Sequence, residues 1–268
     1  MKVMLATPCY SGYVHFNHAH SVAETLAASA VTGSGRHSVQ WVRAGGLGCP
    51  VLPRVRNVLC AQMLADQPDG VPFDGILFID DDIAFKPDDA LRIVSHGEQI
   101  VAGTAQKRVV RHGDAPELNA AIERMAPMDR RGLIRNTLVP ACFLWIHRSV
   151  FEQLLASEEL DANGMVKRFI YSTLPDEAMK WCATYFGYGL ASARHNGVEN
   201  RIAERLGIED PLVDIGEDYD FAIKCEVAGI YSYIDSTIEL VHYDGRVAHD
   251  WSLPRAFATG LAKMKEAS

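Results

Sequence analysis

Three adjacent carboxylates, Asp80, Asp81 and Asp82, directly follow the apolar run GILFI at residues 75–79. Alternate residues of an extended chain point the same way, so Asp80 and Asp82 can converge on one ligand while Asp81 faces elsewhere. Two converging carboxylates repel each other unless a cation lies between them, and such oxygen ligands suit Mg²⁺ or Mn²⁺ ions that also bind substrate phosphates. We therefore predict a divalent metal site here, in preference to an acidic turn that only caps the next helix.

A second acidic cluster places Glu217, Asp218 and Asp220 in the first turn of a predicted helix. Acidic residues are favourable at a helix N-terminus in themselves, so these carboxylates alone do not indicate chemistry. The strand that follows, YSYIDSTIELVHYDG, ends close to His242, and an imidazole at that end of the same sheet can reach an ion held by Asp82. Together these residues favour a general base beside a metal centre.

The segment PRVRN puts two cations and an amide, Arg54, Arg56 and Asn57, in the first turn of a helix predicted over residues 53–66. Cations at this position oppose the positive end of the helix dipole. A bound anion resolves that conflict, because phosphates bind at helix N-termini and arginine adds bidentate hydrogen bonds. The alternative interpretation is two solvated arginines on a surface helix.

The elements that must position these residues alternate between strands and helices through the first half of the chain. Strands are predicted at residues 3–7, 38–42, 76–79, 99–104 and 138–146, and helices from Ser21, over 53–66 and over 87–97. The helix start at Ser21 rests on a capping-box pattern, in which Glu24 follows three residues later. This order predicts an α/β sheet, in which ligands bind outside the carboxyl ends of the strands, where the aspartate triplet stands.

The composition predicts one soluble domain, because a chain of 268 residues with 48% hydrophobic residues can bury a substantial core. The longest apolar stretch, residues 138–146, is far shorter than the ~20 residues of a membrane span, so we expect no span and a cytoplasmic protein. Six cysteines without a CxxC pair predict buried free thiols. A net charge of −8 argues against nucleic acid as a partner.

Five segments in chain order resemble the GT-A family of nucleotide-sugar-dependent glycosyltransferases. They are ATPCYSG, RVRN, FIDDDIAFKPD, ACFLWIHRSVFE, and GEDYDFAIKCEVAG followed by VHYDG. The resemblance implies a GT-A (Rossmann-like) α/β fold with a mixed, mostly parallel central sheet flanked by helices, in a single domain over residues 1–268. Within it, residues 1–104 would form the nucleotide-binding half, 105–245 the acceptor half, and 246–268 a C-terminal lid or tail.

The same resemblance implies a metal-dependent hexosyl- or pentosyltransferase. It would move a sugar from a nucleotide-sugar donor, a UDP-sugar, to a glycan or other hydroxyl-bearing acceptor, with Mn²⁺ or Mg²⁺ as cofactor. Residue by residue, the resemblance assigns the donor site to Thr7, Pro8, Tyr10, Arg54, Asn57, Asp80 and Asp81. It assigns the metal to Asp82, Asp80 and His242. The base would be Asp218, or Glu217 beside it, a placement that leans towards inversion.

Two further features bear on the substrates. The segment GTAQKRVVRHG is a predicted loop that carries the positive charges of Lys107, Arg108 and Arg111. These side chains either bind an anionic acceptor or are exposed to solvent without a ligand. If the tail orders over the donor as a mobile lid, its candidate contacts are His249, Trp251 and Arg255.

Three other functions compete with glycosyl transfer. A nucleotidyltransferase places acidic metal ligands on a similar sheet, but usually has a glycine-rich loop after its first strand, where this chain has only Gly12. A zinc hydrolase would use His15, His18 and His20, whose spacing matches none of the usual helical ligand patterns. A non-catalytic nucleotide- or sugar-binding module would keep the fold without turnover.

Overall fold

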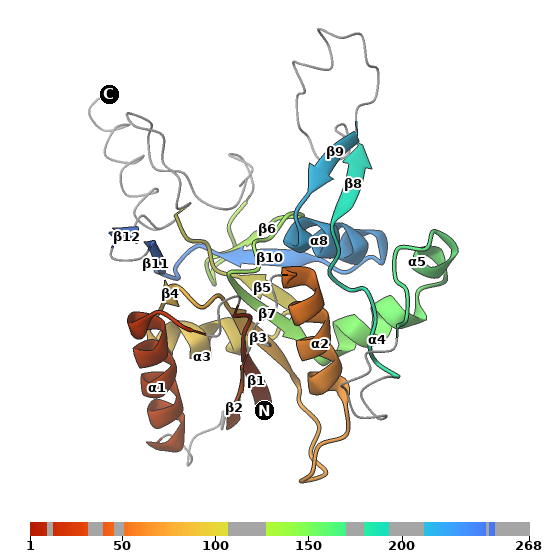
Figure 1. Ribbon diagram of the computed structural model, residues 1–268. Coiled ribbons are helices and arrows are strands. Elements are labelled where there is room, and N and C mark those ends of the chain that lie inside the picture. The colour runs from red at the N-terminus through yellow and green to blue at the C-terminus, as the bar shows by residue number, and fades with distance from the viewer. Residues whose placement is uncertain are drawn as a thin grey trace, which may run out of the picture.

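Seven strands form the central sheet of the computed structural model, which describes residues 1–9, 13–31, 40–45, 51–106, 127–169, 180–192, 212–244 and 247–249 (Figure 1). Their order across the sheet is β2 (Gln40–Gly45), β1 (Lys2–Thr7), β3 (Gly75–Ile79), β7 (Phe143–His147), β5 (Ile100–Ala102), β10 (Ser232–Asp235) and β6 (Leu133–Arg135). Strands β7 and β6 run against the other five. The chain is thus a single α/β domain with a mixed, mostly parallel sheet, as predicted.

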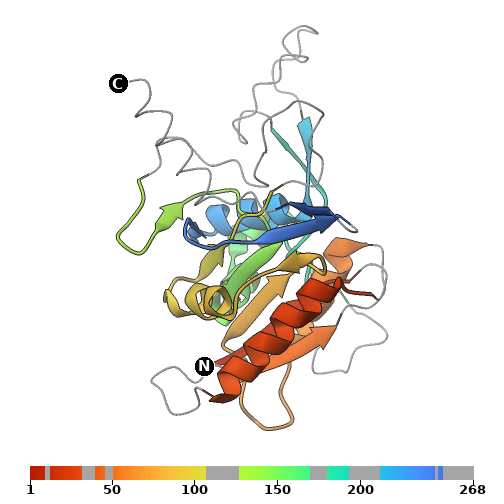
Figure 2. The ribbon, with the colours of Figure 1, turned by 90° about the vertical axis from the view of Figure 1, so that its left-hand side faces the viewer.

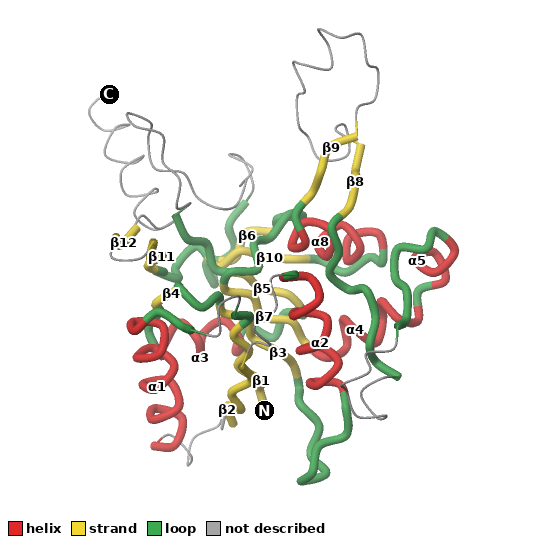
Figure 3. The backbone as a smooth tube through the Cα atoms, in the orientation of Figure 1, coloured by secondary structure: helices red, strands yellow, loops and turns green. Residues whose placement is uncertain are grey.

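Helices cover both faces of this sheet (Figures 1 and 3). One face packs against α2 (Leu52–Leu64), α4 (Arg148–Ala156), α5 (Glu158–Ala162) and α8 (Glu217–Val227), and the other against α1 (Phe16–Val31) and α3 (Pro87–Ser95). In β3, Ile76 and Phe78 belong to the first core, while Leu77 and Ile79 belong to the second. Because side chains alternate along a strand, an unbroken apolar run suits a strand buried on both faces.

Two smaller sheets extend from the central one. Strands β4 (Ile83–Ala84), β11 (Val241–Asp244) and β12 (Val247–His249) form an antiparallel sheet. Strands β8 (Gly189–Ser192) and β9 (Leu212–Ile215) pair as a ribbon that projects from the domain (Figure 1). Since β4 directly follows the aspartate triplet, its pairing with β11 brings the chain after Asp82 beside His242.

Helix α1 begins at Phe16, more than a turn before the predicted start at Ser21. In Figure 2, α1 lies in front of the sheet. Ser21 is buried within the helix, and its Oγ accepts a hydrogen bond from the Phe85 main-chain N–H at 3.1 Å. The predicted capping role is therefore wrong, because this hydroxyl joins α1 to the chain after β4.

Strand β7 begins at Phe143, later than the predicted strand at 138–146. Pro140, in the lead-in, has no N–H to donate to a strand ladder, which accounts for the shorter strand. Within the described residues, Cys9, Cys60, Cys142, Cys182 and Cys225 are buried and form no disulfide. Nor does that part of the chain contain a helix long and apolar enough to cross a membrane.

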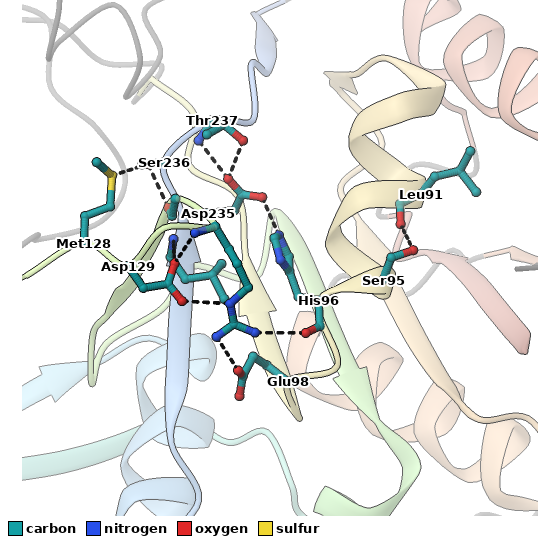
Figure 4. Close-up of polar contacts among 12 residues, drawn as sticks. Leu91, Ser95, His96, Glu98, Met128, Asp129, Asp235, Ser236 and Thr237 are labelled. Atoms are coloured by element: carbon teal, nitrogen blue, oxygen red, sulfur yellow. Dashed lines mark hydrogen bonds and ion pairs between the residues drawn. The ribbon is translucent and has the colours of Figure 1, made fainter. Parts of the chain in front are cut away.

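A polar network ties the end of β10 to the chain after α3 (Figure 4). The fully buried Asp235 carboxylate accepts hydrogen bonds from the N–H and hydroxyl of Thr237 at 2.8 and 2.6 Å. Its other oxygen lies 2.7 Å from His96 Nε2. Arg131 extends the network by donating to the His96 main-chain carbonyl at 3.1 Å. This network holds α3 and β10 together.

Candidate active site

The aspartate triplet lies where β3 leaves the central sheet. The Asp80 N–H still donates to the Cys142 carbonyl at 3.0 Å, and the Ile83 N–H donates to the Asp80 carbonyl at 3.1 Å. The chain therefore turns over Asp81 and Asp82 before it enters β4. The three aspartates are half-buried, at the edge of the sheet where ligands bind in open α/β folds.

Asp82 and His242 form a pair beside this turn. The Tyr243 N–H donates to the Asp82 carbonyl at 3.0 Å, which fixes the two strands in register. His242 Nδ1 lies 2.7 Å from the Gln106 carbonyl and therefore donates to it, because a carbonyl only accepts. In a neutral imidazole, Nε2 then presents a lone pair, and it lies 3.5 Å from Asp82 Oδ1. Either a proton on Nε2 or a cation between the two atoms makes this contact favourable.

The geometry of the Asp82–His242 pair fits a divalent cation. Two atoms that each bind one ion at about 2.1 Å are about 3 to 3.6 Å apart for bond angles of about 90° to 120°, and the observed separation is 3.5 Å. Among the described residues, however, no group of three His, Cys, Asp or Glu side chains is arranged to hold an ion. That Asp80 joins Asp82 and His242 around one metal therefore stays a prediction, and the structure shows Asp80 Oδ1 paired with an arginine.

That arginine is Arg56, whose side chain is only 1% exposed. Its Nη2 donates to Asp80 Oδ1 at 2.8 Å, and its Nη1 donates to the Ala141 carbonyl at 3.3 Å. Its Nε lies 3.6 Å from Glu217 Oε1. Burial alone would lower the pKa of this guanidinium, but the charges of Asp80 and Glu217 outweigh burial and raise the pKa. Arg56 therefore stays cationic and links the triplet to the N-terminus of α8.

Sequence reasoning chose Arg54 for the donor site and missed the role of Arg56. Two residues along a helix point about 200° apart, and Arg54 is exposed where Arg56 is buried. A usable signal was present, since Arg56, Cys60 and Met63 follow the i, i+4, i+7 spacing of one helical stripe. An arginine on an apolar stripe indicates a buried cation with acidic partners.

Glu217 and Asp218 begin α8, directly after Gly216. The Glu217 side chain is 13% exposed and faces Arg56. Burial, followed by the neighbouring charge of Glu217, raises the pKa of Asp218 to about 6, although Arg56 acts in the opposite direction. A carboxylate with a pKa near neutrality is suited to accept a proton. The structure thus brings Glu217 and Asp218, the two candidates for the general base, to the same edge of the sheet as the aspartate triplet.

The third acid of this helix, Asp220, and the predicted donor residue Asn57 hold the backbone in place. Asn57 is buried, and its amide exchanges two hydrogen bonds with the main chain of Phe186, at 2.8 and 2.9 Å. Lys224 pairs with Asp220 at 2.5 Å and donates to the Thr184 carbonyl at 2.9 Å. These contacts clamp the segment 184–186 between α2 and α8. The donor contact of Asn57 stays a prediction, and the structure shows both ends of its amide bound to Phe186.

At the end of β1, Thr7 and Pro8 are both buried. The Thr7 hydroxyl lies 3.0 Å from His18 Nε2, and His18 Nδ1 lies 3.0 Å from the Ile83 carbonyl. His18 therefore connects β1 with β4. His15 instead stacks on the ring of Tyr243, with ring centroids 4.2 Å apart. The described chain thus gives no support to a zinc site of three histidines.

Several predicted residues lie outside the described residues. They are Tyr10, Lys107, Arg108, Arg111, Trp251 and Arg255. His249 belongs to β12, where its backbone pairs in register with His242. Asp81 contributes its carbonyl to the site, accepting the His15 N–H at 2.8 Å.

No family model matches the chain, and no curated protein matches it in sequence. Among solved structures, the crystal structure of A197 from STIV is similar to it at a TM-score of 0.48 and 14% identity. The similarity covers 95% of this chain and 92% of that one. No activity follows from a similarity of this size.

Proposed function

We propose that this protein is a metal-dependent glycosyltransferase of the GT-A type that transfers a sugar from a UDP-sugar to a hydroxyl acceptor. The observation that carries the proposal is that two acidic clusters, the aspartate triplet and the Glu217–Asp218 pair, lie together at one edge of the sheet. The Asp82–His242 pair has the spacing of two metal ligands. Asp80 and Arg56 connect this region with Glu217 and the adjacent Asp218, whose raised pKa suits it to proton transfer.

The charge of this edge supports metal dependence. Four carboxylates gather there, from Asp80, Asp82, Glu217 and Asp218, and the buried guanidinium of Arg56 already pairs with two of them. A nucleoside diphosphate is itself anionic and would be repelled by such a surface. A divalent cation removes that repulsion, because it attracts the carboxylate and the diphosphate together.

Asp82 and His242 are the residues that would hold the ion, and phosphate oxygens and water would supply the remaining ligands. When bound, the ion supplies Lewis-acid stabilisation of the charge on the leaving diphosphate. His242 is pre-oriented for this role by its Nδ1 hydrogen bond to the Gln106 carbonyl, which directs Nε2 towards Asp82.

In the transfer step, the acceptor oxygen forms a bond to the anomeric carbon while the bond from that carbon to the diphosphate oxygen breaks. The electron pair of the broken bond leaves with the nucleoside diphosphate. The proton of the acceptor hydroxyl passes to a carboxylate of the Glu217–Asp218 pair. A hydroxyl has a very high pKa, so this proton must be accepted as the attack proceeds.

The proposal is tested by a thermal-shift panel of UDP, GDP, CDP, dTDP and their sugar conjugates, each with and without Mn²⁺. A ligand that binds the native state raises the melting temperature by mass action. We expect a shift with UDP compounds that requires Mn²⁺ and is lost in Asp82→Ala. The matched control is Asp88→Asn, because Asp88 is an exposed acid in the first turn of α3.

Three results would overturn the proposal. They are no shift with any nucleotide, a shift that is independent of Mn²⁺, or equal shifts in Asp82→Ala and the wild type. A shift with another nucleotide would replace UDP but keep the reaction class. Release of nucleoside diphosphate from the stabilising donor, measured next, separates a transferase from a binding module.

A further inference from the structure

Two nitrogens of the Arg56 guanidinium form hydrogen bonds, whereas the third, Nε, is buried without one and faces an acid. Nη2 donates to Asp80, Nη1 to the Ala141 carbonyl, and Nε faces Glu217 at 3.6 Å. The rings of Phe78 and Phe186 lie 5.1 and 5.9 Å from the guanidinium carbon. Side chains packed this closely leave Arg56 one orientation, so its ion pairs are fixed partners rather than surface contacts.

Asp218 is adjacent to this arrangement but outside its ion pairs. Among the acids of the described chain, Arg56 forms ion pairs with Asp80 and Glu217. The Asp218 carboxylate accepts a hydrogen bond from the Tyr219 N–H at 2.9 Å. It also folds back over Gly216, where an added Cβ would lie 3.0 Å from its Oδ1. Asp218 therefore keeps a carboxylate that no cation holds by direct contact within the described residues.

We propose that Arg56 is a positioning residue that commits Asp80 and Glu217 to ion pairs and thereby leaves Asp218 as the proton acceptor of the site. The inference rests on the proposed function, because a proton acceptor needs a reaction to serve. It assigns different roles to the adjacent carboxylates of Glu217 and Asp218, which the sequence alone does not distinguish. Arg56 acts through these acids and needs no contact with the substrate.

The division has an electrostatic consequence that is measurable without any substrate. The charge of Glu217 raises the pKa of Asp218, whereas the charge of Arg56 lowers it. Glu217→Gln should therefore lower the pKa of Asp218, and Arg56→Gln should raise it. Two neighbours of one carboxyl group are thus expected to shift its titration in opposite directions.

The experiment is a ¹³C NMR titration of the protein labelled at aspartate carboxyl carbons, with the Asp218 signal assigned by its loss in Asp218→Asn. We expect an Asp218 midpoint near pH 6 in the wild type, a lower midpoint in Glu217→Gln and a higher one in Arg56→Gln. The control is Glu226→Gln, a variant at the other end of α8, which should leave the midpoint in place. If Arg56→Gln does not fold, Glu217→Gln still provides the test.

An Asp218 midpoint that does not move in Glu217→Gln, or that rises, would overturn the proposal. The kinetic arm then compares transfer rates. Asp218→Asn should lose most of the activity, and Glu217→Gln should lose less than a tenth as much, with its acidic limb moved to lower pH. Equal losses in both variants would also overturn the proposal. If the titrations behave as expected but no nucleotide-sugar reacts, the proposed function fails, while the opposite effects of Arg56 and Glu217 on the pKa of Asp218 stand.

Discussion

Two buried acids of this protein, Asp235 and Asp218, are treated in opposite ways by their surroundings. Burial alone would raise the pKa of Asp235, but hydrogen bonds from His96 and Thr237 outweigh it and lower the pKa (Figure 4). At Asp218, burial and the charge of Glu217 prevail over Arg56 and raise the pKa to about 6. In the described chain, both oxygens of Asp235 have donors, whereas Asp218 accepts a hydrogen bond from the Tyr219 N–H on one oxygen.

The difference separates an acid that holds the fold together from one that is available for chemistry. Asp235 has partners for both oxygens, so its ionised form stabilises the native state. Asp218 shares its region with Asp80 and Glu217, and the Arg56 guanidinium forms its ion pairs with those two acids. Carboxylates whose burial and like-charged neighbours raise their pKa are found preferentially at functional sites.

The largest effect should come from Asp218→Asn. The neutral amide keeps the shape of the side chain but cannot accept the proton, so glycosyl transfer should fall by about 10²- to 10⁴-fold. Circular dichroism and the melting temperature should remain those of a folded protein. A transfer rate within tenfold of the wild type would show that Asp218 is not the proton acceptor. Asp218 and Asp235 would then not differ in function.

Asp235→Ala should do the reverse. Removing one partner of a buried pair leaves the other uncompensated, so the free energy of unfolding should fall by about 3 kcal/mol, as measured by urea denaturation. Transfer per folded molecule should change little, because Asp235 belongs to the structural network. The control is Asp129→Asn, an exposed acid that pairs with Arg131 at the rim of the same network. Equal destabilisation in both variants would contradict the account.

The pH dependence of stability should differ in sign between the two acids. Asp235 has a lowered folded pKa, so its contribution is present above the unfolded value of about 3.9 and is lost as pH falls through the folded pKa. Asp218 has a raised folded pKa of about 6, so its contribution is full below about pH 3.9 and is lost as pH rises through about 6. Asp218→Asn should therefore be more stable than the wild type at pH 8, by an amount on the order of 1 kcal/mol, and not at pH 3.5. Thermal melts at both pH values check the sign.

The smallest effect should come from Arg54→Ala. Its side chain is exposed, and surface substitutions usually change the free energy of unfolding by less than about 0.5 kcal/mol. The dissociation constant for UDP with Mn²⁺ should change by less than about twofold, which corresponds to about 0.4 kcal/mol. A tenfold loss of UDP affinity, measured by calorimetry, would show instead that Arg54 contacts the donor.

The sequence predicted the frame of the fold and the location of the acidic residues well. The apolar run before Asp80 indicated a strand buried on both faces, and β3 is such a strand. The position of the triplet at a carboxyl end followed from that strand. The approach of His242 to Asp82 was also anticipated, because both were expected at strand ends of one edge.

What the sequence could not predict was how polar side chains divide among partners. Asn57 was expected at the donor, yet its amide pairs with the Phe186 backbone, a contact between residues distant in the chain. Asp80 was expected at the metal, and nothing in the sequence indicated that one of its oxygens accepts a hydrogen bond from the buried Arg56. Such choices depend on long-range packing, whereas motifs record only local spacing. The start of α1 was missed for a related reason, since Ser21 bonds to Phe85 across the fold.

The central claim is that Asp82 and His242 form a cation site that a nucleoside diphosphate completes, and electron paramagnetic resonance of Mn²⁺ tests it most directly. The signal of free Mn²⁺ should fall when protein and UDP are both present, and it should fall much less with protein alone. In Asp82→Ala and His242→Ala the free signal should return to the level given by UDP without protein, while Asp88→Asn behaves as the wild type. Retention of Mn²⁺ in both site variants, or no retention with any nucleoside diphosphate, would contradict the account.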